Sequence, residues 1–390
     1  MKIEIVGKFY DNHSLTIINR NLAIELSNSH DVYVTPLDSY DPAYGVSKHI
    51  IKKIKTLTEK EHPKQGGLDI QIRHSYPPIW QWPSHDNTKV IYIQPWEYPK
   101  LPFEWQHKWE TFADHIIVPS NYIRNIAIRG GLDPQKISTI PNGYNDKVFN
   151  KEAKPTNKFG IDSSKFNFVY VGNSQWRKGL DILINAWHKS FKSYDNARLI
   201  IKDNPQIYGK NNVLNEIVKM QYKTGCAKVT YIDSVLSDED MSELFAASKV
   251  VVHPYRAEGF GMHIQEAVAC GCLPILPDKG PHQDFIPDDI GLRVQTKPSP
   301  IDITSGEVFA QKPGDSFTMM NSHTFMNEPD GHSLQKMLQW IYHSHDKEEY
   351  FKRANEVELP NTWETVAKSY IEIIENTHGK ESSPYRIRHR

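Results

Sequence analysis

The chain is poor in several features that would point to other classes of protein. It has only three cysteines, too few for a disulfide framework, and their spacing matches no zinc pattern. It has no surplus of charge that would attract nucleic acid, because 46 basic residues stand against 47 acidic ones. No apolar run approaches the ~18 residues of a membrane span, and the opening residues read as a strand and not as a signal peptide. These absences predict a cytoplasmic protein with no nucleic-acid partner.

Two common site motifs are also missing. The first predicted strand, 2–6, is followed by no G-x-G-x-x-G, so dinucleotide binding is not indicated there. Asp238-x-Asp240 has the form of a metal-binding D-x-D, but it follows Ser237 at a predicted helix start, where capping is the expected role. No metal site is therefore predicted. The 390 residues favour two domains of about 150–200 residues each.

The most informative stretch runs from residue 249 to residue 277. A β-branched run at 249–253 predicts a buried strand, and the apolar spacing of 262–270 predicts a helix that ends at Gly271. Between them, Gly259 and Gly261 flank Phe260, and a turn here lets backbone N–H groups face a ligand with no Cβ in the way. A Gly-rich turn between a parallel strand and a helix N-terminus is a typical anion site.

Two carboxylates flank this turn. Glu258 precedes it, and Glu266 lies about one and a half turns into the helix. Helical side chains lean toward the helix N-terminus, so Glu266 can reach back over the turn. A carboxylate can hold two neighbouring hydroxyls. The arrangement suits a ligand with a phosphate in the middle and a polyol at each end, which is the shape of a nucleotide sugar.

A second loop carries positive charge. The dense β run 166–171 is followed by Gly172 and then by Arg177 and Lys178, just before a predicted helix. Arg can grip phosphate oxygens with two N–H groups, and Lys adds a mobile point charge. This loop therefore also suits an anion.

Taken together, the two glutamates around Gly-Phe-Gly and the basic pair resemble the signature of retaining glycosyltransferases of the family 4 type (glycosyl transferases group 1). Segments 113–122 and 137–148 are also similar to that family. The resemblance implies an α/β GT-B fold, with two Rossmann-like parallel-sheet domains facing each other across a cleft. An acceptor-binding domain is expected over 1–155, with a last helix at about 362–380 packing back on it, and a nucleotide-sugar domain over 156–361.

The family also implies roles for individual residues. Arg177 and Lys178 are expected to hold the diphosphate of the donor, Glu258 the sugar hydroxyls, and Glu266 the ribose. The nucleobase is expected at the loop from Asp233 to Leu236. The remaining residues expected to line the donor site are Gly7, Gly172, Gly259, Phe260 and Gly261. No cofactor and no metal are expected beside the nucleotide-diphosphate sugar.

The acceptor side is predicted from aromatic, proline-rich loops that follow two strands. Tyr76, Gln94 and Trp96 are the candidate residues, with plain loop packing as the alternative. Many relatives carry a His near this position, whereas this chain has Gln94, which cannot change its charge. A proton relay is therefore not expected there, although hydrogen bonding is. The acceptor class implied by the family is a carbohydrate, a lipid-linked molecule or a protein. The basic amphipathic segment 47–60 is either a helix packed on the core or a contact with the inner face of an anionic membrane.

The predicted reaction is metal-independent transfer of a hexosyl-type sugar to an acceptor hydroxyl, with retention of anomeric configuration. Three alternatives stay open: double displacement through Glu258, a sugar-nucleotide epimerase of the same fold, and a non-catalytic partner of another glycosyltransferase. The sequence departs from the family at 202–205, where Lys-Asp-Asn-Pro replaces a Gly-rich turn, and at 292–328, which predicts a hairpin insertion. It makes no prediction about the nucleotide base, the sugar transferred, the identity and linkage of the acceptor, or the oligomeric state.

Overall fold

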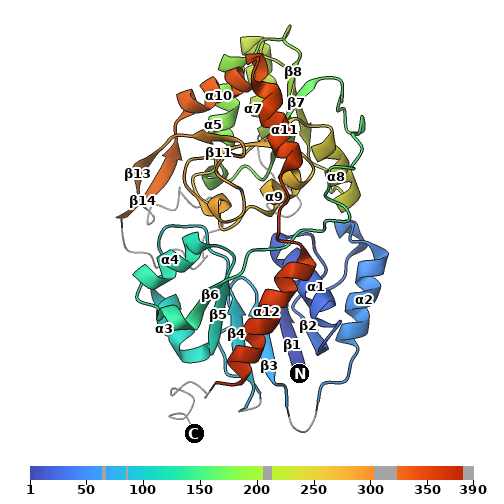
Figure 1. The fold of residues 1–390 in the computed structure, drawn as a ribbon, viewed down its shortest axis with the longest axis vertical. Coiled ribbons are helices and arrows are strands. Elements are labelled where there is room, and N and C mark those ends of the chain that lie inside the picture. The colour runs from blue at the N-terminus through green and yellow to red at the C-terminus, as the bar shows by residue number, and fades with distance from the viewer. Residues whose placement is uncertain (64–66, 85–86, 205–212, 303–322, 381–390) are drawn as a thin grey trace. The chain divides into compact units, whose positions relative to one another are not determined.

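The chain divides into two compact units in the computed structural model (Figure 1). The structure describes residues 1–63, 67–84, 87–204, 213–302 and 323–380. The first unit comprises Met1–Gly143 together with the residues from Pro360 onward, and the second comprises Tyr144–Leu359. The chain therefore enters the second unit at residue 144 and leaves it at residue 359, whereas the boundaries predicted from the sequence are 156 and 361.

The first unit is built on a six-stranded parallel sheet. Its strands are rich in β-branched residues and buried on both faces, as in sheets covered by helices on each side. The order across the sheet is β2-β1-β3-β4-β5-β6. The strands are β1 (Lys2–Gly7), β2 (Asp31–Pro36), β3 (Ile70–His74), β4 (Lys89–Ile93), β5 (His115–Val118) and β6 (Ile137–Thr139).

Helices cover this sheet, and one of them comes from the far end of the chain. The helices are α1 (Ser14–Leu26), α2 (Lys48–Thr58), α3 (Phe103–Phe112), α4 (Asn121–Arg129) and α12 (Trp363–His378), with short 3-10 turns η1 (Pro42–Tyr44) and η2 (Pro134–Lys136). Thr362 caps α12 by accepting a hydrogen bond from the Thr365 backbone N–H at 3.2 Å. Trp363 packs so closely on Gly143 that a Cβ there would lie 2.5 Å from the indole ring. The last helix thus completes the first unit.

The amphipathic segment predicted over 47–60 forms α2. Its apolar residues Ile51, Ile54 and Leu57 are buried, and the helix packs against β2 and α1. Its lysines at 48, 52, 53 and 55 are exposed. The core-packed alternative therefore describes this helix, and its apolar stripe is not available to a lipid surface. Among the described residues no helix has the length and hydropathy needed to cross a bilayer.

The second unit also contains a six-stranded parallel sheet. Its order is β12-β11-β10-β7-β8-β9, so the chain starts in the middle and builds outward in both directions. Open sheets of this kind bind ligands beyond the carboxyl ends of the strands, at the point where the order reverses. Here that point lies between β7 and β10, which are hydrogen-bonded neighbours. The strands are β7 (Phe166–Val171), β8 (Ala197–Lys202), β9 (Val229–Ile232), β10 (Val250–Val252), β11 (Leu273–Pro277) and β12 (Leu292–Val294).

The helices of the second unit carry the predicted motifs. They are α5 (Leu180–Ser190), α7 (Val213–Thr224), α8 (Asp238–Ala246), α9 (Met262–Ala269), α10 (Gly331–His343) and α11 (Lys347–Glu356), with 3-10 turns η3 (Trp176–Lys178) and η4 (Pro281–Asp284). Ser237 caps α8 by accepting from the Asp240 N–H at 3.1 Å. The Asp238-x-Asp240 sequence therefore opens a helix, as predicted.

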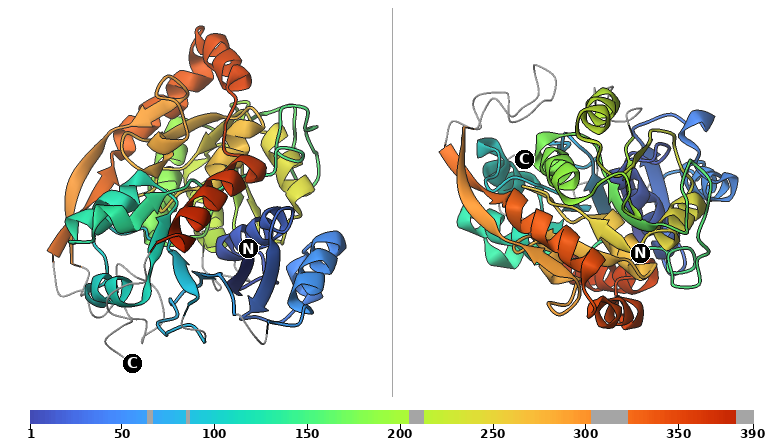
Figure 2. Two further views of the ribbon diagram at one scale, coloured as in Figure 1. Left: turned by 60° about the horizontal axis from the view of Figure 1, so that its bottom comes forward. Right: turned by 90° about the horizontal axis from the view of Figure 1, so that it is seen from above.

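The hairpin predicted over 292–328 is confirmed in part, because residues 292–294 form β12 of the parallel sheet and the antiparallel strands begin after them. Strands β13 (Thr296–Asp302) and β14 (His323–Pro329) pair antiparallel, from Thr296 opposite Pro329 to Asp302 opposite His323. Residues 303–322 between them lie outside the described part of the chain. Figure 2 shows the two strands as a long two-stranded ribbon beside α10. Its base is joined to the start of that helix, because the Asp330 N–H donates to the Gln295 carbonyl at 2.8 Å.

Candidate functional site

The predicted basic pair and the first predicted carboxylate meet at the reversal point of the second sheet. Lys178 Nζ forms an ion pair with Glu258 Oε2, and Arg177 Nη1 lies 3.8 Å from the same oxygen. These side chains are largely buried, with 11%, 12% and 8% of Arg177, Lys178 and Glu258 exposed. Two cations against one carboxylate leave a surplus positive charge at the end of β7 and β10.

The charges around Glu258 keep it ionised. Burial acts to raise the pKa of Glu258, but the positive charges of Lys178 and then Arg177 outweigh it, so the pKa lies well below its ordinary value. Its second oxygen accepts from the Gly259 N–H at 3.1 Å. Glu258 is therefore a fixed, charged acceptor at working pH.

The Gly-Phe-Gly turn brings the N-terminus of α9 to the same place. Gly261 has a left-handed backbone (φ 95°), which glycine adopts without strain, and it starts the helix. The first N–H groups of a helix have no partner inside it and attract anions. Phe260 is buried and its ring lies 4.4 Å from that of Phe285, so only its backbone can face a ligand.

The second predicted carboxylate has the opposite electrostatic character. Glu266 lies on α9 and its side chain makes no hydrogen bond or ion pair with any described residue. Part of it reaches solvent, yet burial and then the charge of Asp238 raise its pKa to about 8. Glu266 is thus mostly protonated at neutral pH in the ligand-free protein, and it can donate as well as accept hydrogen bonds.

One buried arginine that the sequence analysis missed holds the two loops together. Arg256 donates to both oxygens of Asp181 at 2.8 Å and to both oxygens of Glu328 at 2.6 and 2.9 Å. It also donates to the Trp176 carbonyl at 2.6 Å and stacks over the Trp176 ring at 4.2 Å. Its own N–H donates to the Arg177 carbonyl at 2.7 Å. Arg256 therefore links the basic loop, the glutamate loop and the β13–β14 hairpin.

The other predicted donor residues lie at the same edge of the sheet. Gly172 follows β7, and a Cβ there would lie 3.1 Å from Tyr170 Oη and 3.3 Å from His253 Nε2. Asp233 and Leu236 lie in the loop after β9; Asp233 is exposed and Leu236 is buried. Where the family has a Gly-rich turn, Lys202 is buried and donates to the Asp203 carbonyl; burial lowers its pKa to about 8.

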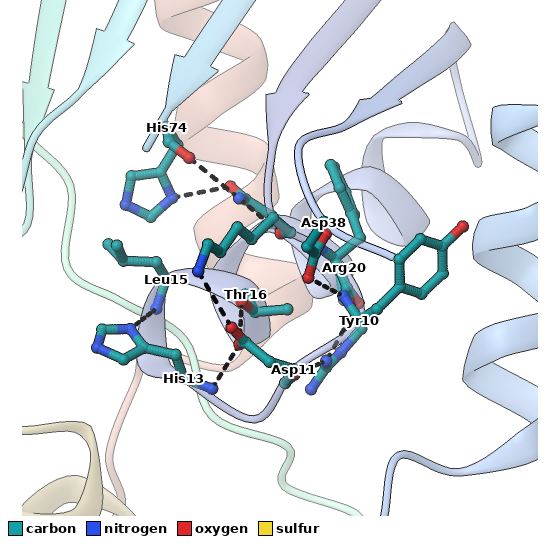
Figure 3. Close-up of polar contacts among 11 residues, drawn as sticks. Tyr10, Asp11, His13, Leu15, Thr16, Arg20, Asp38 and His74 are labelled. Carbon is teal, nitrogen blue, oxygen red and sulfur yellow. Dashed lines mark hydrogen bonds and ion pairs between the residues drawn. The ribbon is translucent and has the colours of Figure 1, made fainter. Parts of the chain in front are cut away.

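Gly7 belongs to the first unit, at the reversal point between β1 and β3 of its own sheet. A Cβ on Gly7 would lie 2.3 Å from Asn19 Nδ2 and 2.4 Å from the His74 carbonyl. Asn19 donates to that carbonyl at 3.2 Å, and its Oδ1 pairs with His74 Nδ1 at 2.8 Å. Figure 3 shows His74 and the loop that follows Gly7. Gly7 is required there for close packing inside the unit.

The same loop is held by charged side chains. Asp38 accepts from the Phe9 and Tyr10 N–H groups at 2.8 and 2.9 Å, and Arg20 donates to the Phe9 and Asp11 carbonyls (Figure 3). These bonds fix the backbone that leads into α1.

Two of the predicted acceptor-side residues do not present their side chains to solvent. Gln94 is 1% exposed, and its amide donates to the Pro95 carbonyl at 3.2 Å. Trp96 is also 1% exposed, with its indole N–H bonded to the Lys100 carbonyl and its ring 4.8 Å from that of Trp105. The alternative of loop packing describes both residues, because both side chains are buried and bonded to carbonyls of their own loop. Tyr76 is 37% exposed.

Models of two glycosyltransferase families match the two parts of the chain. "Glycosyltransferase Family 4" matches residues 70–148 and "Glycosyl transferases group 1" matches residues 152–304, which contain the basic pair and both glutamates. The chain belongs to the family 4 type of glycosyltransferases.

Individual relatives of this glycosyltransferase-family chain are distant. A subunit of the phosphatidylinositol N-acetylglucosaminyltransferase of Saccharomyces cerevisiae is 22% identical over 287 residues, covering 71% of this chain. The chain spans only 59% of the length of that relative. D-inositol 3-phosphate glycosyltransferase of Segniliparus rotundus is 27% identical over 149 residues, which are 38% of this chain and 32% of that protein.

Solved structures share the GT-B fold of the family. HepE of Anabaena, in a complex with UDP and glucose, has a TM-score of 0.60 at 14% identity, covering 96% of this chain and 100% of that one. Sucrose-phosphate synthase of Thermosynechococcus elongatus has a TM-score of 0.61 at 16% identity, covering 96% and 98%. The predicted family and GT-B fold are thereby confirmed.

Proposed function

We propose that the second unit binds a nucleotide-diphosphate sugar and that the protein transfers this sugar to an acceptor hydroxyl. The observation that carries the proposal is the buried group of Arg177, Lys178 and Glu258 at the reversal point of a parallel sheet. The complexes of HepE with UDP and glucose and with UDP-glucose support a sugar nucleotide as donor.

The chemistry requires a place for negative charge. Breaking the bond between the sugar and the diphosphate leaves charge on the diphosphate oxygens. Arg177 and Lys178 already lie in a desolvated site beside the N-terminus of α9, so they need little reorganisation when this charge develops. Before the donor binds, Glu258 occupies both cations; the diphosphate would then share them with Glu258. In this scheme the stabilisation comes from the protein and needs no metal ion.

The two glutamates have different parts in the proposal. Glu258, charged and fixed by its ion pairs, accepts hydrogen bonds from sugar hydroxyls. Glu266 has no hydrogen-bonding partner among the described residues, and its carboxyl group suits the two ribose hydroxyls.

Retention of configuration is proposed to arise by reaction on one face of the sugar, with the leaving phosphate accepting the acceptor's proton. Both oxygens of Glu258 are engaged in hydrogen bonds or ion pairs, and its low pKa makes it a weak nucleophile. A covalent glycosyl adduct on Glu258, found by mass spectrometry, would establish double displacement instead.

The acceptor is proposed to be a hydroxyl-bearing carbohydrate or lipid-linked polyol. Two relatives carry the names of such acceptors, phosphatidylinositol and D-inositol 3-phosphate. An assay with a labelled donor separates the functions: transfer needs the acceptor, whereas an epimerase would convert the donor alone.

The first experiment is a thermal-shift screen with UDP, GDP, ADP and their sugars. A ligand at 100 times its Kd adds about 2.7 kcal/mol to the unfolding free energy. Lys178→Ala and Arg177→Ala are expected to lower kcat by about 10²–10³ while the fold persists. Lys219→Ala is the control, because Lys219 is an exposed lysine of the same unit. Wild-type turnover in both site variants, or no nucleotide bound at all, would refute the proposal.

A further inference from the structure

One side chain beside the proposed donor site has no assigned role. His263 is the second residue of α9 and lies two positions after Gly261. Its ring is half-buried, and its Nε2 is shielded from solvent without a hydrogen-bond partner among the described residues. Within the described part of the chain Nδ1 has no hydrogen-bond partner either, and it is not one of the solvent-shielded atoms, so this nitrogen is the one that can meet a ligand.

The ring of His263 packs against a buried ring, which in turn packs against another. It lies 4.5 Å from the ring of His253, which is fully buried. His253 in turn stacks on Tyr170 at 4.9 Å, with an angle of 12° between the planes. These contacts connect the His263 ring to the buried core of the unit.

His263 is uncharged although it lies among charged groups. Burial and then the positive charge of Lys178 lower its pKa to about 3, and Glu258 acts in the opposite direction. A neutral imidazole has one nitrogen that donates and one that accepts. In either tautomer Nδ1 therefore offers a single neutral hydrogen bond. It adds no charge to a site in which Arg177 and Lys178 already supply cations for a diphosphate.

A neutral group at this position suits a neutral partner. Sugar hydroxyls are neutral, and each both donates and accepts a hydrogen bond, so they match an imidazole nitrogen in either tautomer. Phosphate oxygens, in contrast, are bound best by the cations nearby. Glu258, to which the proposed function gives the sugar hydroxyls, lies beside the start of the same helix: a Cβ on Gly261, two residues before His263, would lie 3.7 Å from Glu258 Cγ.

We propose that His263 contacts a hydroxyl of the transferred sugar through Nδ1 and helps to select which sugar is accepted. The inference rests on the proposed function, because it assumes that a sugar nucleotide binds at Glu258. In this proposal the part of the donor that His263 contacts is the sugar, and not the nucleoside or the diphosphate.

The test compares a nucleotide with its sugar conjugate. Calorimetry measures the Kd of UDP and of UDP-glucose, or of the matching pair if the screen selects another base or sugar, for the wild type, His263→Ala and His263→Asn. A neutral hydrogen bond of about 0.5–1.5 kcal/mol corresponds to a change of about twofold to tenfold in Kd. His263→Ala is expected to weaken UDP-glucose by this factor and leave UDP unchanged, and Asn should restore part of the loss.

A second measurement, with its own control variant, tests whether His263 affects the choice of sugar. The order of kcat/KM across a panel of donor sugars should change in His263→Ala. It should not change in the control His345→Ala, which alters an exposed histidine of the same unit. Equal losses for UDP and UDP-glucose, or no loss for either, would overturn the inference and leave the proposed function intact. A wild type that binds no nucleotide would overturn both.

Discussion

Gly179 sets the distance between the basic loop and the glutamate loop. It lies between η3 and α5 with a left-handed backbone (φ 72°). A Cβ at this position would lie 1.8 Å from the Pro254 carbonyl oxygen, in the loop that leads to Glu258. Because the obstacle is backbone, no side-chain rotation can relieve it. Gly179→Ala must therefore move one loop away from the other.

The size of the effect follows from these values. Bringing the contact to the 3.0 Å that real Cβ atoms require needs a shift of 3.0 − 1.8 = 1.2 Å. The left-handed backbone costs a non-glycine residue about 1–2 kcal/mol. The shift also strains two hydrogen bonds to the Arg177 carbonyl, from the Arg256 and Ala257 N–H groups at 2.7 and 3.2 Å, at about 1 kcal/mol each. We expect a loss of about 3–4 kcal/mol in unfolding free energy.

Activity should fall further than stability alone explains. A displacement of about 1 Å in a positioning group can cost about 10²-fold in rate. Gly225→Ala is the matched control: its φ is 58°, and a Cβ built there meets no atom of the residues that the structure describes within 4 Å. Urea unfolding and donor kinetics of both variants separate backbone strain from loop displacement. If Gly179→Ala keeps wild-type kcat/KM, or if Gly225→Ala loses as much activity, then Gly179 does not set the spacing of the two loops.

Four other substitutions test separate parts of the structure. Glu266→Gln should stabilise the ligand-free protein at pH 7. The pKa of Glu266 in the folded protein, about 8, exceeds the ordinary value of 4.5, so the unfolding free energy of the wild type should fall as the pH rises from 4.5 to 8. The unfolding free energy measured with urea should change less over this pH range in the variant. Arg256→Lys should lower the unfolding free energy by about 1–3 kcal/mol, because Lys lacks the planar fork that pairs with both oxygens of Asp181 and of Glu328. Glu328→Ala removes one of these pairs and should weaken donor binding several-fold by calorimetry. Gly7→Ala should cost about 1–3 kcal/mol in thermal unfolding, since its Cβ meets the His74 backbone.

Much of the fold could be predicted from local patterns. Buried parallel strands are short runs of β-branched and aromatic residues, so β7 and β10 could be recognised from their residues alone. The order of strands in each sheet could not, because it depends on which edges meet after the whole chain has folded. The same holds for Trp96: an aromatic residue in a loop reads alike whether it faces solvent or packs on Trp105.

The site shows the same division. Glu258 and the basic pair could be found because they flank glycines at strand ends, where function concentrates. Arg256 could not, since a lone arginine carries no signal until Asp181 and Glu328, far apart in sequence, are brought to it. His263 gives no pattern of its own either; its meaning comes from the rings behind it.

The membership of α12 in the first unit has a consequence for synthesis on the ribosome. The sheet of that unit is encoded before residue 143, yet Trp363 and Tyr370, which are buried in it, come only after the whole second unit. At about 5–20 residues per second, the intervening stretch delays them by roughly 10–45 s. The second unit is continuous in sequence and can finish folding while the first still exposes the apolar surface that α12 will cover. During this period the first unit of the nascent chain is the one whose apolar surface is open to solvent.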